Sequence, residues 1–295
     1  MGSALRGAFG MALKKTICPV KQRDCRSCQL YQTCLYTYIF ETPPPQDRNV
    51  LRKHSHIPHP FVLFLMNHNQ TDFVPGETLT FGLTLIGNAV NHLPFCVYAL
   101  ITMGKKGLGH TRGKYQLIDI RSLDEHSISK ESVYDGEHMY QPQTILTAHH
   151  AQTLSDQFCG NQTGLELLTP VRLRFDNRLC NCLEFHIVIR NLLRRLSNLI
   201  QFHCQGQEHI PFNEFIEAST KIHISQDQTF WYDWRRFSSR KKKWMKLGGL
   251  KGKIFWQGPV QKFIPILVMG QWVHIGKNTG FGLGQYQLTE ICNTI

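Results

Sequence analysis

The chain has 295 residues, 42% of them hydrophobic and 18% charged, which favours a globular protein of two domains and excludes a disordered chain. Its formal charge of +12 at pH 7 favours polyanionic partners, and nucleic acid is the first of these. No apolar run reaches the roughly 18 residues of a membrane helix, and no signal-peptide pattern is present. We therefore expect a cytoplasmic protein with no membrane partner.

The first predicted element is a helix over residues 2–16, and a cysteine-rich insertion follows it over about residues 17–45. Cys18, Cys25, Cys28 and Cys34 have the spacing C-x6-C-x2-C-x5-C. Four thiolates in one short stretch can surround a structural zinc ion or hold an iron–sulfur cluster. Reduced thiols or a redox-labile pair are the alternative, because the outer spacings match no standard zinc ribbon.

Two segments far apart in the sequence share one pattern. They are MGKKGLGHTRGKYQLIDI, from Met103 to Ile120, and VHIGKNTGFGLGQYQLTEI, from Val273 to Ile291. Each leads through a glycine loop into Tyr-Gln-Leu and an alternating strand pattern, and each follows a predicted strand and helix. The repeat predicts two domains, residues 1–150 and 151–295. Chance similarity of two glycine-rich turns is the alternative.

The second half extends this pattern backward. Residues 165–175 have a strand pattern, residues 185–203 an amphipathic helix pattern, and residues 221–234 a further strand region. The resulting order, β-α-β-β-α-β, is that of a ferredoxin-like module, which many RNA-binding domains use. We predict an α+β protein with tandem ferredoxin-like (RRM-like) domains. The first domain is interrupted by the cysteine-rich insertion and lacks its first strand, because no strand pattern precedes its first helix.

A densely basic segment, RRFSSRKKKWMKLGGLKGK, runs from Arg235 to Lys253 and includes Trp244. Trp231, Tyr232 and Trp234 lie just upstream. Lysine and arginine neutralise phosphates, and aromatic rings can stack on bases. A solvated basic surface is the alternative for the charges, and the core of a strand is the alternative for the aromatic residues.

Several of these segments occur in the order of a known family. GSALRGAFGMAL and the cysteine group precede YTYIFETPPP (residues 36–45) and PHPFVL (residues 58–63), and FVPGETLTFGLTLIG, LLTPVRLRF and the two glycine loops complete the series. Over nearly the whole chain the sequence resembles a CRISPR-associated RAMP-superfamily endoribonuclease that processes precursor CRISPR RNA. The C-terminal glycine loop is common to the superfamily, whereas FETPPP and the cysteine group indicate the processing nucleases.

The resemblance implies cleavage of CRISPR repeat RNA to make mature guide RNA, without a catalytic metal. In that reaction a 2′-hydroxyl attacks the scissile phosphate and gives a 2′,3′-cyclic phosphate and a free 5′-hydroxyl. The reaction needs a base, an acid and cations that stabilise the phosphorane. The alternative function is a non-catalytic RAMP subunit that binds guide RNA within a CRISPR effector complex, and DNA is not expected as a direct ligand. A redox or iron–sulfur protein built on the cysteines is a third interpretation.

Two histidines are the catalytic candidates. His59 lies between two prolines after FETPPP, near His54 and His56, and His274 opens the C-terminal glycine loop beside Lys277. Each has a structural alternative: packing at a strand entry for His59, and a hydrogen bond that shapes the loop for His274.

The predicted RNA contacts come from both glycine loops and the basic segment. They are Arg112, Lys114, Arg235, Arg236, Arg240, Lys241, Lys242, Lys243, Gly276, Lys277, Gly280, Gly282 and Gly284. The glycines of the second loop would let backbone N–H groups approach a phosphate closely. A tight turn required by packing is the alternative for these glycines.

Overall fold

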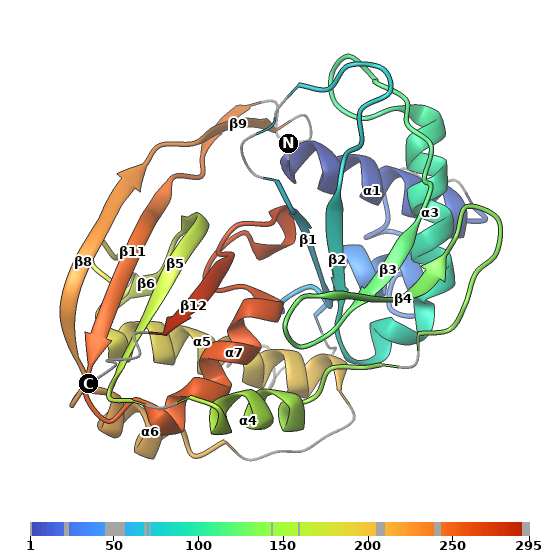
Figure 1. Ribbon diagram of the computed structural model, residues 1–295. Coiled ribbons are helices and arrows are strands. Elements are labelled where there is room, and N and C mark those ends of the chain that lie inside the picture. The colour runs from blue at the N-terminus through green and yellow to red at the C-terminus, as the bar shows by residue number, and fades with distance from the viewer. Residues whose placement is uncertain are drawn as a thin grey trace. The chain divides into compact units, whose positions relative to one another are not determined.

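The computed structural model describes residues 2–20, 24–44, 57–67, 70, 72–142, 144–158, 160–204, 210–238 and 243–290. The chain divides into two compact units. Unit 1 comprises Met1–Leu63, Leu83–Thr144 and Asn198–Glu208, and unit 2 comprises Phe64–Gly82, Ile145–Ser197 and His209–Ile295. Both units mix helices and strands (Figure 1), which confirms the predicted α+β class.

A four-stranded antiparallel sheet forms the centre of unit 2. Its strands lie in the order β12 (Tyr286–Glu290), β5 (Gln162–Val171), β11 (Gly249–Gln257) and β8 (His223–Tyr232). With helices α5 (Phe185–His203) and α7 (Ile264–Val273), the chain order is β5-α5-β8-β11-α7-β12. This is the β-α-β-β-α-β order predicted from the sequence.

One face of this sheet carries the core of unit 2. Ile254 and Trp256 of β11 are fully buried. The Trp256 ring meets Phe185 of α5 edge-on, with 5.4 Å between ring centroids, and its Nε1–H donates a hydrogen bond to the Leu183 carbonyl at 3.0 Å. Phe185 in turn packs against Phe263 beside α7. The helices therefore cover this face, which we call the inner face, and the opposite one is the outer face.

Shorter elements complete unit 2. They are α4 (Ala148–Asp156), β6 (Arg174–Phe175), β7 (Arg178–Leu179), α6 (Phe212–Ser219), β9 (Arg235–Ser238), β10 (Lys243–Lys246) and the 3-10 turns Gln261–Phe263 and Thr279–Phe281. Strands β9 and β10 pair with each other, and the Leu247 N–H donates to the Trp234 carbonyl at 2.7 Å. They therefore extend the β8–β11 pair, and we call the two paired segments, residues 223–238 and 243–257, the long hairpin.

Unit 1 is more helical. Its elements are α1 (Gly2–Ile17), a π-helical turn (Thr37–Glu41), a 3-10 turn (Gly87–His92), α3 (Leu93–Lys106) and the pair β3 (Ile120–Leu123) and β4 (Ser129–Tyr134). It also holds the first three residues of β1 (Phe61–Leu65) and the last three of its partner β2 (Phe81–Leu85), whose other residues belong to unit 2. Leu5, Phe9 and Leu13 of α1 are fully buried where this helix packs on α3. None of the described helices combines the length and apolar character that crossing a membrane requires.

The strand predicted after the first glycine loop is wrong for most of its length. Residues 114–119 belong to no helix or strand, and only Ile120 belongs to a strand. Tyr115 explains the difference, because its hydroxyl donates to the Leu100 carbonyl at 2.8 Å and its backbone N–H donates to Gly104. These bonds fix the segment against α3. In the part of unit 1 that the structure describes, the strands form two separate pairs.

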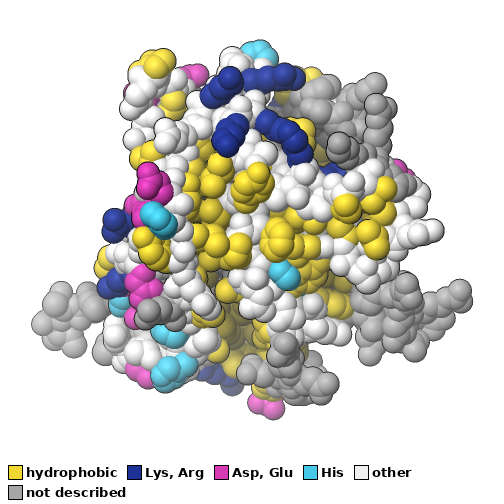
Figure 2. Space-filling view, turned by 90° about the vertical axis from the view of Figure 1, so that its right-hand side faces the viewer, with side chains coloured by type: hydrophobic (Ala, Val, Ile, Leu, Met, Phe, Trp, Pro, Cys, Tyr) yellow, Lys and Arg dark blue, Asp and Glu magenta, His cyan; other side chains and the backbone are white. Residues whose placement is uncertain are grey.

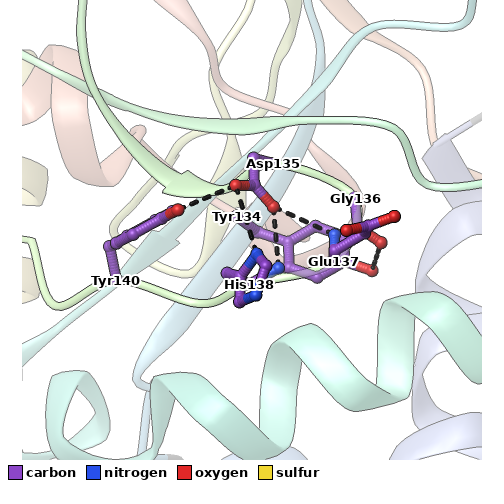
Figure 3. A network of polar contacts seen from close by, with 6 residues as sticks. All are labelled: Tyr134, Asp135, Gly136, Glu137, His138 and Tyr140. Carbon is purple, nitrogen blue, oxygen red and sulfur yellow. Dashed lines mark hydrogen bonds and ion pairs between the residues drawn. The ribbon is translucent and has the colours of Figure 1, made fainter.

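The turn after β4 is fixed by one carboxylate (Figure 3). Asp135 Oδ1 accepts hydrogen bonds from the backbone N–H groups of His138 at 2.7 Å and Glu137 at 3.0 Å, and Tyr140 donates its hydroxyl proton to Oδ2 at 2.8 Å. The bonds from the backbone of His138 and Glu137, followed by that from Tyr140, lower the pKa of the Asp135 carboxyl to about 2, because they stabilise its charged form.

This depressed pKa predicts a pH-dependent contribution to stability. The contribution is present above the ordinary carboxyl value of 3.8 and is lost as the pH falls toward 2, because protonation removes the acceptor. We expect the difference in unfolding free energy between the wild type and Asp135→Asn, measured by urea denaturation, to shrink across this window. Asp119→Asn, which removes an exposed carboxylate paired with Arg121, is the control. A difference for Asp135→Asn that does not change with pH would contradict the assignment.

Candidate functional site

His59 lies in unit 1 with a polar side chain at each ring nitrogen. Arg6 Nη2 is 3.0 Å from Nε2, and Thr42 Oγ1 is 2.7 Å from Nδ1. A guanidinium can only donate, so in this arrangement Nε2 accepts and Nδ1 carries the proton. The Thr42 hydroxyl donates onward to the Tyr38 carbonyl at 3.3 Å. The hydrogen-bond partners thus assign a single tautomer, with the lone pair of the ring at Nε2 beside a cation.

The backbone that carries Thr42 is unusual. Residues Thr37–Glu41 form a π-helical turn, and Thr42 follows with φ of 49° and ψ of 73°, in the left-handed region. For a β-branched residue this conformation costs on the order of 1–3 kcal/mol, and both features concentrate at functional sites. The strained residue is buried, and its hydroxyl is the group that contacts the His59 ring. The fold therefore uses backbone strain to hold this histidine in one orientation.

Aromatic rings enclose the same histidine. The ring planes of Phe40 and Phe61 are within 14° and 23° of the His59 plane. The Arg6 guanidinium lies 4.3 Å from the centre of the Phe40 ring. The Phe40 ring reaches this position because Gly10 has no side chain, and a Cβ there would collide with it. Three segments that carried the family resemblance, LRGAFG, YIFET and PHP, therefore meet at one half-buried imidazole.

His274, the second candidate, lies in the interior of unit 2. It is 1% exposed and ends α7 with φ of 61°. Its Nδ1 is 3.2 Å from the Leu283 carbonyl, which can only accept, so Nδ1–H is the donor. The ring packs against Phe64, with 5.5 Å between centroids. This geometry favours the structural alternative, in which the histidine shapes the glycine loop.

A buried cation supports the same corner. Arg195 of α5 donates from Nε and Nη2 to the Val273 carbonyl at 2.9 and 2.6 Å. Burial lowers the pKa of Arg195 to about 10, which leaves the guanidinium charged at pH 7. It therefore stabilises the carbonyl end of α7, where the helix dipole is negative.

The glycines of the second loop serve the packing of the chain on itself. Gly276, Gly282 and Gly284 have φ of 81°, 77° and 74°. A Cβ on Gly276 would lie 2.6 Å from the Arg172 carbonyl oxygen, and one on Gly284 would collide with the Ile275 carbonyl. The Ile275 N–H also donates a hydrogen bond to the Gly284 carbonyl at 2.9 Å. The tight turn required by packing is thus present. Contact of phosphate with Gly276, Gly280, Gly282 and Gly284 stays a prediction.

Replacement of Gly284 by alanine tests this steric requirement. We expect Gly284→Ala to lower the free energy of unfolding by about 3 kcal/mol or more, from left-handed strain plus overlap with a carbonyl. Gly109→Ala is the matched control, because Gly109 has φ of 76° and no atom within 4 Å of an added Cβ. The control should lose about 1–2 kcal/mol. Chemical denaturation measures both values, and equal losses would contradict the argument.

The predicted basic contacts are exposed wherever their side chains are described. Arg112 and Lys114 are exposed after α3, Arg235 and Lys243 are exposed on the long hairpin, and Lys277 is exposed in the glycine loop. Figure 2 shows Lys and Arg side chains gathered near the top of one face, above a surface where hydrophobic side chains lie among other uncharged groups. Some of the predicted site residues lie outside the described residues or side chains: His54, His56, the Arg236 side chain, Arg240, Lys241 and Lys242.

The four clustered cysteines are free, half-buried thiols. They lie in hydrogen-bonded turns, such as the one in which the Cys28 N–H donates to the Cys25 carbonyl at 3.1 Å. Within the described ranges, no three His, Cys, Asp or Glu side chains come together in a way that could hold a metal ion. The arrangement therefore gives no support to metal binding at Cys18, Cys25, Cys28 and Cys34, and zinc or an iron–sulfur cluster stays a prediction from their spacing.

Comparison with known proteins defines the class. Residues 165–286 match the family model of the CRISPR-associated endoribonuclease Cas6, and residues 1–146 match a family model described as an N-terminal domain. A solved Cas6 product complex shares 13% identity at a TM-score of 0.53, over 96% of this chain and 91% of that chain. A partial Cas6-RT-Cas1–Cas2 complex shares 13% identity at a TM-score of 0.50, over 79% of this chain and 39% of that chain.

A sequence relative is also found in an archaeon. It is a protein of Archaeoglobus fulgidus described as uncharacterized, 26% identical over 212 residues, which are 70% of this chain and 68% of the relative. The chain therefore has the α+β fold seen in Cas6 structures. Residues 165–286 are similar to the family of the CRISPR-associated endoribonuclease Cas6, which confirms the resemblance drawn from the sequence.

Proposed function

We propose that the chain is an endoribonuclease that cleaves CRISPR repeat RNA at one site to give mature guide RNA. The match of residues 165–286 to the Cas6 endoribonuclease family model supports cleavage of RNA, and the Cas6 product complex with the same fold supports an RNA ligand. The main observation in support of this active site is that His59 has a hydrogen-bond partner at each ring nitrogen, one of which is the Arg6 guanidinium. The proposal includes tandem ferredoxin-like domains, of which unit 1 is the modified copy.

The proposed chemistry is metal-independent transesterification. The 2′-oxygen forms a bond to phosphorus, the bond from phosphorus to the 5′-oxygen breaks, and the products are a 2′,3′-cyclic phosphate and a 5′-hydroxyl. A base takes the 2′ proton and an acid protonates the leaving oxygen. In the assigned tautomer His59 presents an unprotonated Nε2, which suits the base, and Thr42 keeps the proton on Nδ1.

Arg6 supplies the cation that this reaction needs. Its guanidinium lies over Phe40 and contacts His59 Nε2, so a scissile phosphate next to the histidine would lie within its reach. Guanidinium–phosphate hydrogen bonds are charge-assisted and stronger than a bond to neutral imidazole. Binding of RNA would therefore transfer Arg6 from Nε2 to the phosphate. That exchange frees the base and places positive charge where the phosphorane forms.

The exposed basic residues would bind the RNA backbone. Arg112, Lys114, Arg235, Lys243 and Lys277 project from loops and the hairpin. Each phosphate contact releases counterions, so affinity should fall steeply with salt. The fold similarity to a Cas6 chain within a Cas6-RT-Cas1–Cas2 complex supports association with other CRISPR proteins as a further part of the proposal.

Cleavage of labelled repeat RNA in EDTA tests the function. We expect the wild type to make a single cut with a cyclic phosphate end, and His59→Ala to cut about 10²- to 10⁴-fold more slowly with unchanged RNA affinity. His274→Ala is the paired variant, and it should lower stability more than the cleavage rate. Full activity of His59→Ala would reject this site. Tight binding without cleavage by the wild type would instead favour a non-catalytic RNA-binding subunit.

Variants of Arg6 separate its charge from its packing. We expect Arg6→Ala to lower kcat by about 10²-fold, because the charge acts on the transition state, and Arg6→Lys to recover part of the loss. Steady-state kinetics on the same RNA give kcat and KM separately. An increase in KM alone would show that Arg6 only binds RNA and does not act in the chemical step.

A further inference from the structure

The outer face of the unit 2 sheet carries two exposed aromatic side chains that the proposed function has not used. Trp256 and Ile254 point to the inner face, so Lys253 and Phe255 point to the outer one. Lys253 pairs with Gln228 in the β8–β11 register, and paired residues share a face. Phe230 and Tyr232 follow Gln228 by two and four positions along β8, so they lie on the outer face as well.

A lysine side chain lies beside the rings of Phe230 and Tyr232. Lys251 is the register partner of Phe230, and its Nζ is 5.3 Å from the centre of the Tyr232 ring. Phe230 and Tyr232 are 56% and 44% exposed. Aromatic residues in strands usually bury their rings against a core. Here two such rings and a cation are presented to solvent together on one strand pair.

The charges around these rings favour a polyanion. Lys251 and Lys253 lie on the same face, and the adjoining β9–β10 end of the hairpin carries exposed Arg235, Lys243 and Lys246. The nearby Glu166 carboxylate is paired with Lys253 at 3.2 Å, and Asp233 accepts a hydrogen bond from Trp231 Nε1 at 3.1 Å. Positive charge therefore exceeds negative charge beside the rings.

We propose that Phe230 and Tyr232 form a stacking site for unpaired bases of RNA, with Lys251 and the hairpin cations on the flanking phosphates. The site rests on the proposed function, since it takes the same class of ligand, and it deepens that function by naming how single-stranded nucleotides are held. Every base offers a flat π face, and stacking on aromatic side chains tolerates any sequence. A four-stranded sheet with exposed aromatic residues is a platform that RNA-binding modules use.

Binding of a short single-stranded oligoadenylate tests the site directly. We expect the double variant Phe230→Ala/Tyr232→Ala to lose about tenfold or more in affinity, with the slope of log affinity against log salt unchanged, because stacking releases no counterions. Trp231→Ala is the control: Trp231 is 42% exposed on the same strand but pairs with Leu250 on the inner face. The oligoadenylate affinity of Trp231→Ala should stay within about twofold of the wild-type affinity.

An abasic oligonucleotide of the same length identifies the contact. Wild-type affinity for it should already be reduced, and the double variant should cause no further loss, because the bases that the rings hold are missing. Tyr232→Phe should bind like the wild type, since it keeps the ring and is the gentlest change to the fold. Quenching of 2-aminopurine in RNA bound to the wild type gives a second measurement that needs no variant.

Three results would overturn the proposal: unchanged affinity of the double variant, an equal loss in Trp231→Ala, or an equal loss on the abasic strand. The first would make this face a candidate for a protein partner instead. Failure of the stacking site is distinct from failure of the nuclease assignment. Cleavage by the wild type together with unchanged oligoadenylate affinity of the double variant would support the nuclease alone, whereas an inactive wild type whose oligoadenylate affinity still falls in the double variant would support the stacking site alone.

Discussion

The Phe40 ring lies against Gly10 of α1, and much of the candidate active site is arranged around this contact. With a side chain at position 10, the ring would be displaced from Arg6 above it and from His59 and Phe61 beside it. The π-helical turn that carries Phe40 also ends at the strained Thr42. One missing side chain in a helix thus allows three separate segments to hold an imidazole at both of its nitrogens.

The two candidate histidines show why chemistry at a site depends on access as well as residue type. His59 lies two residues before β1 and His274 follows the end of α7, and both rings have a hydrogen-bond partner at Nδ1. His274 points into a core, where it is 1% exposed and its Nδ1 contacts a carbonyl of its own loop, so its catalytic role stays a prediction. His59 is half-buried and faces a cation, which is the surrounding that phosphoryl transfer requires.

Sequence periodicity predicted the order of strands and helices in unit 2, because alternating and helical spacings there coincide with burial on the inner face. It failed at residues 114–119, where the same alternation belongs to an irregular segment that Tyr115 holds against α3. Periodicity reports which side of a segment is buried, and does not report whether a partner strand is present. The presence of a partner is decided by residues far away in the sequence.

The candidate site was predictable only in part for the same reason. His59 was identifiable from its position after FETPPP, but its contacts with Arg6 and Thr42 span 53 and 17 residues. The available signals were an arginine between apolar residues of α1 and a threonine just before three prolines. The burial of His274 had no signal in the sequence, because the glycines around it suit an open loop and a packed turn equally well.

Strand β8 ends the sheet order in the described part of unit 2, so its outer edge presents unpaired backbone groups next to exposed aromatic rings. Such an edge is a template for pairing with another chain, and lysines along the hairpin counteract this by charge repulsion. Salt weakens that protection, because it screens the repulsion and leaves the edge unchanged. Concentrated protein without nucleic acid is therefore expected to self-associate more readily as ionic strength rises. Salt would thus strengthen contacts between protein chains, whereas it weakens the binding of a basic protein to RNA.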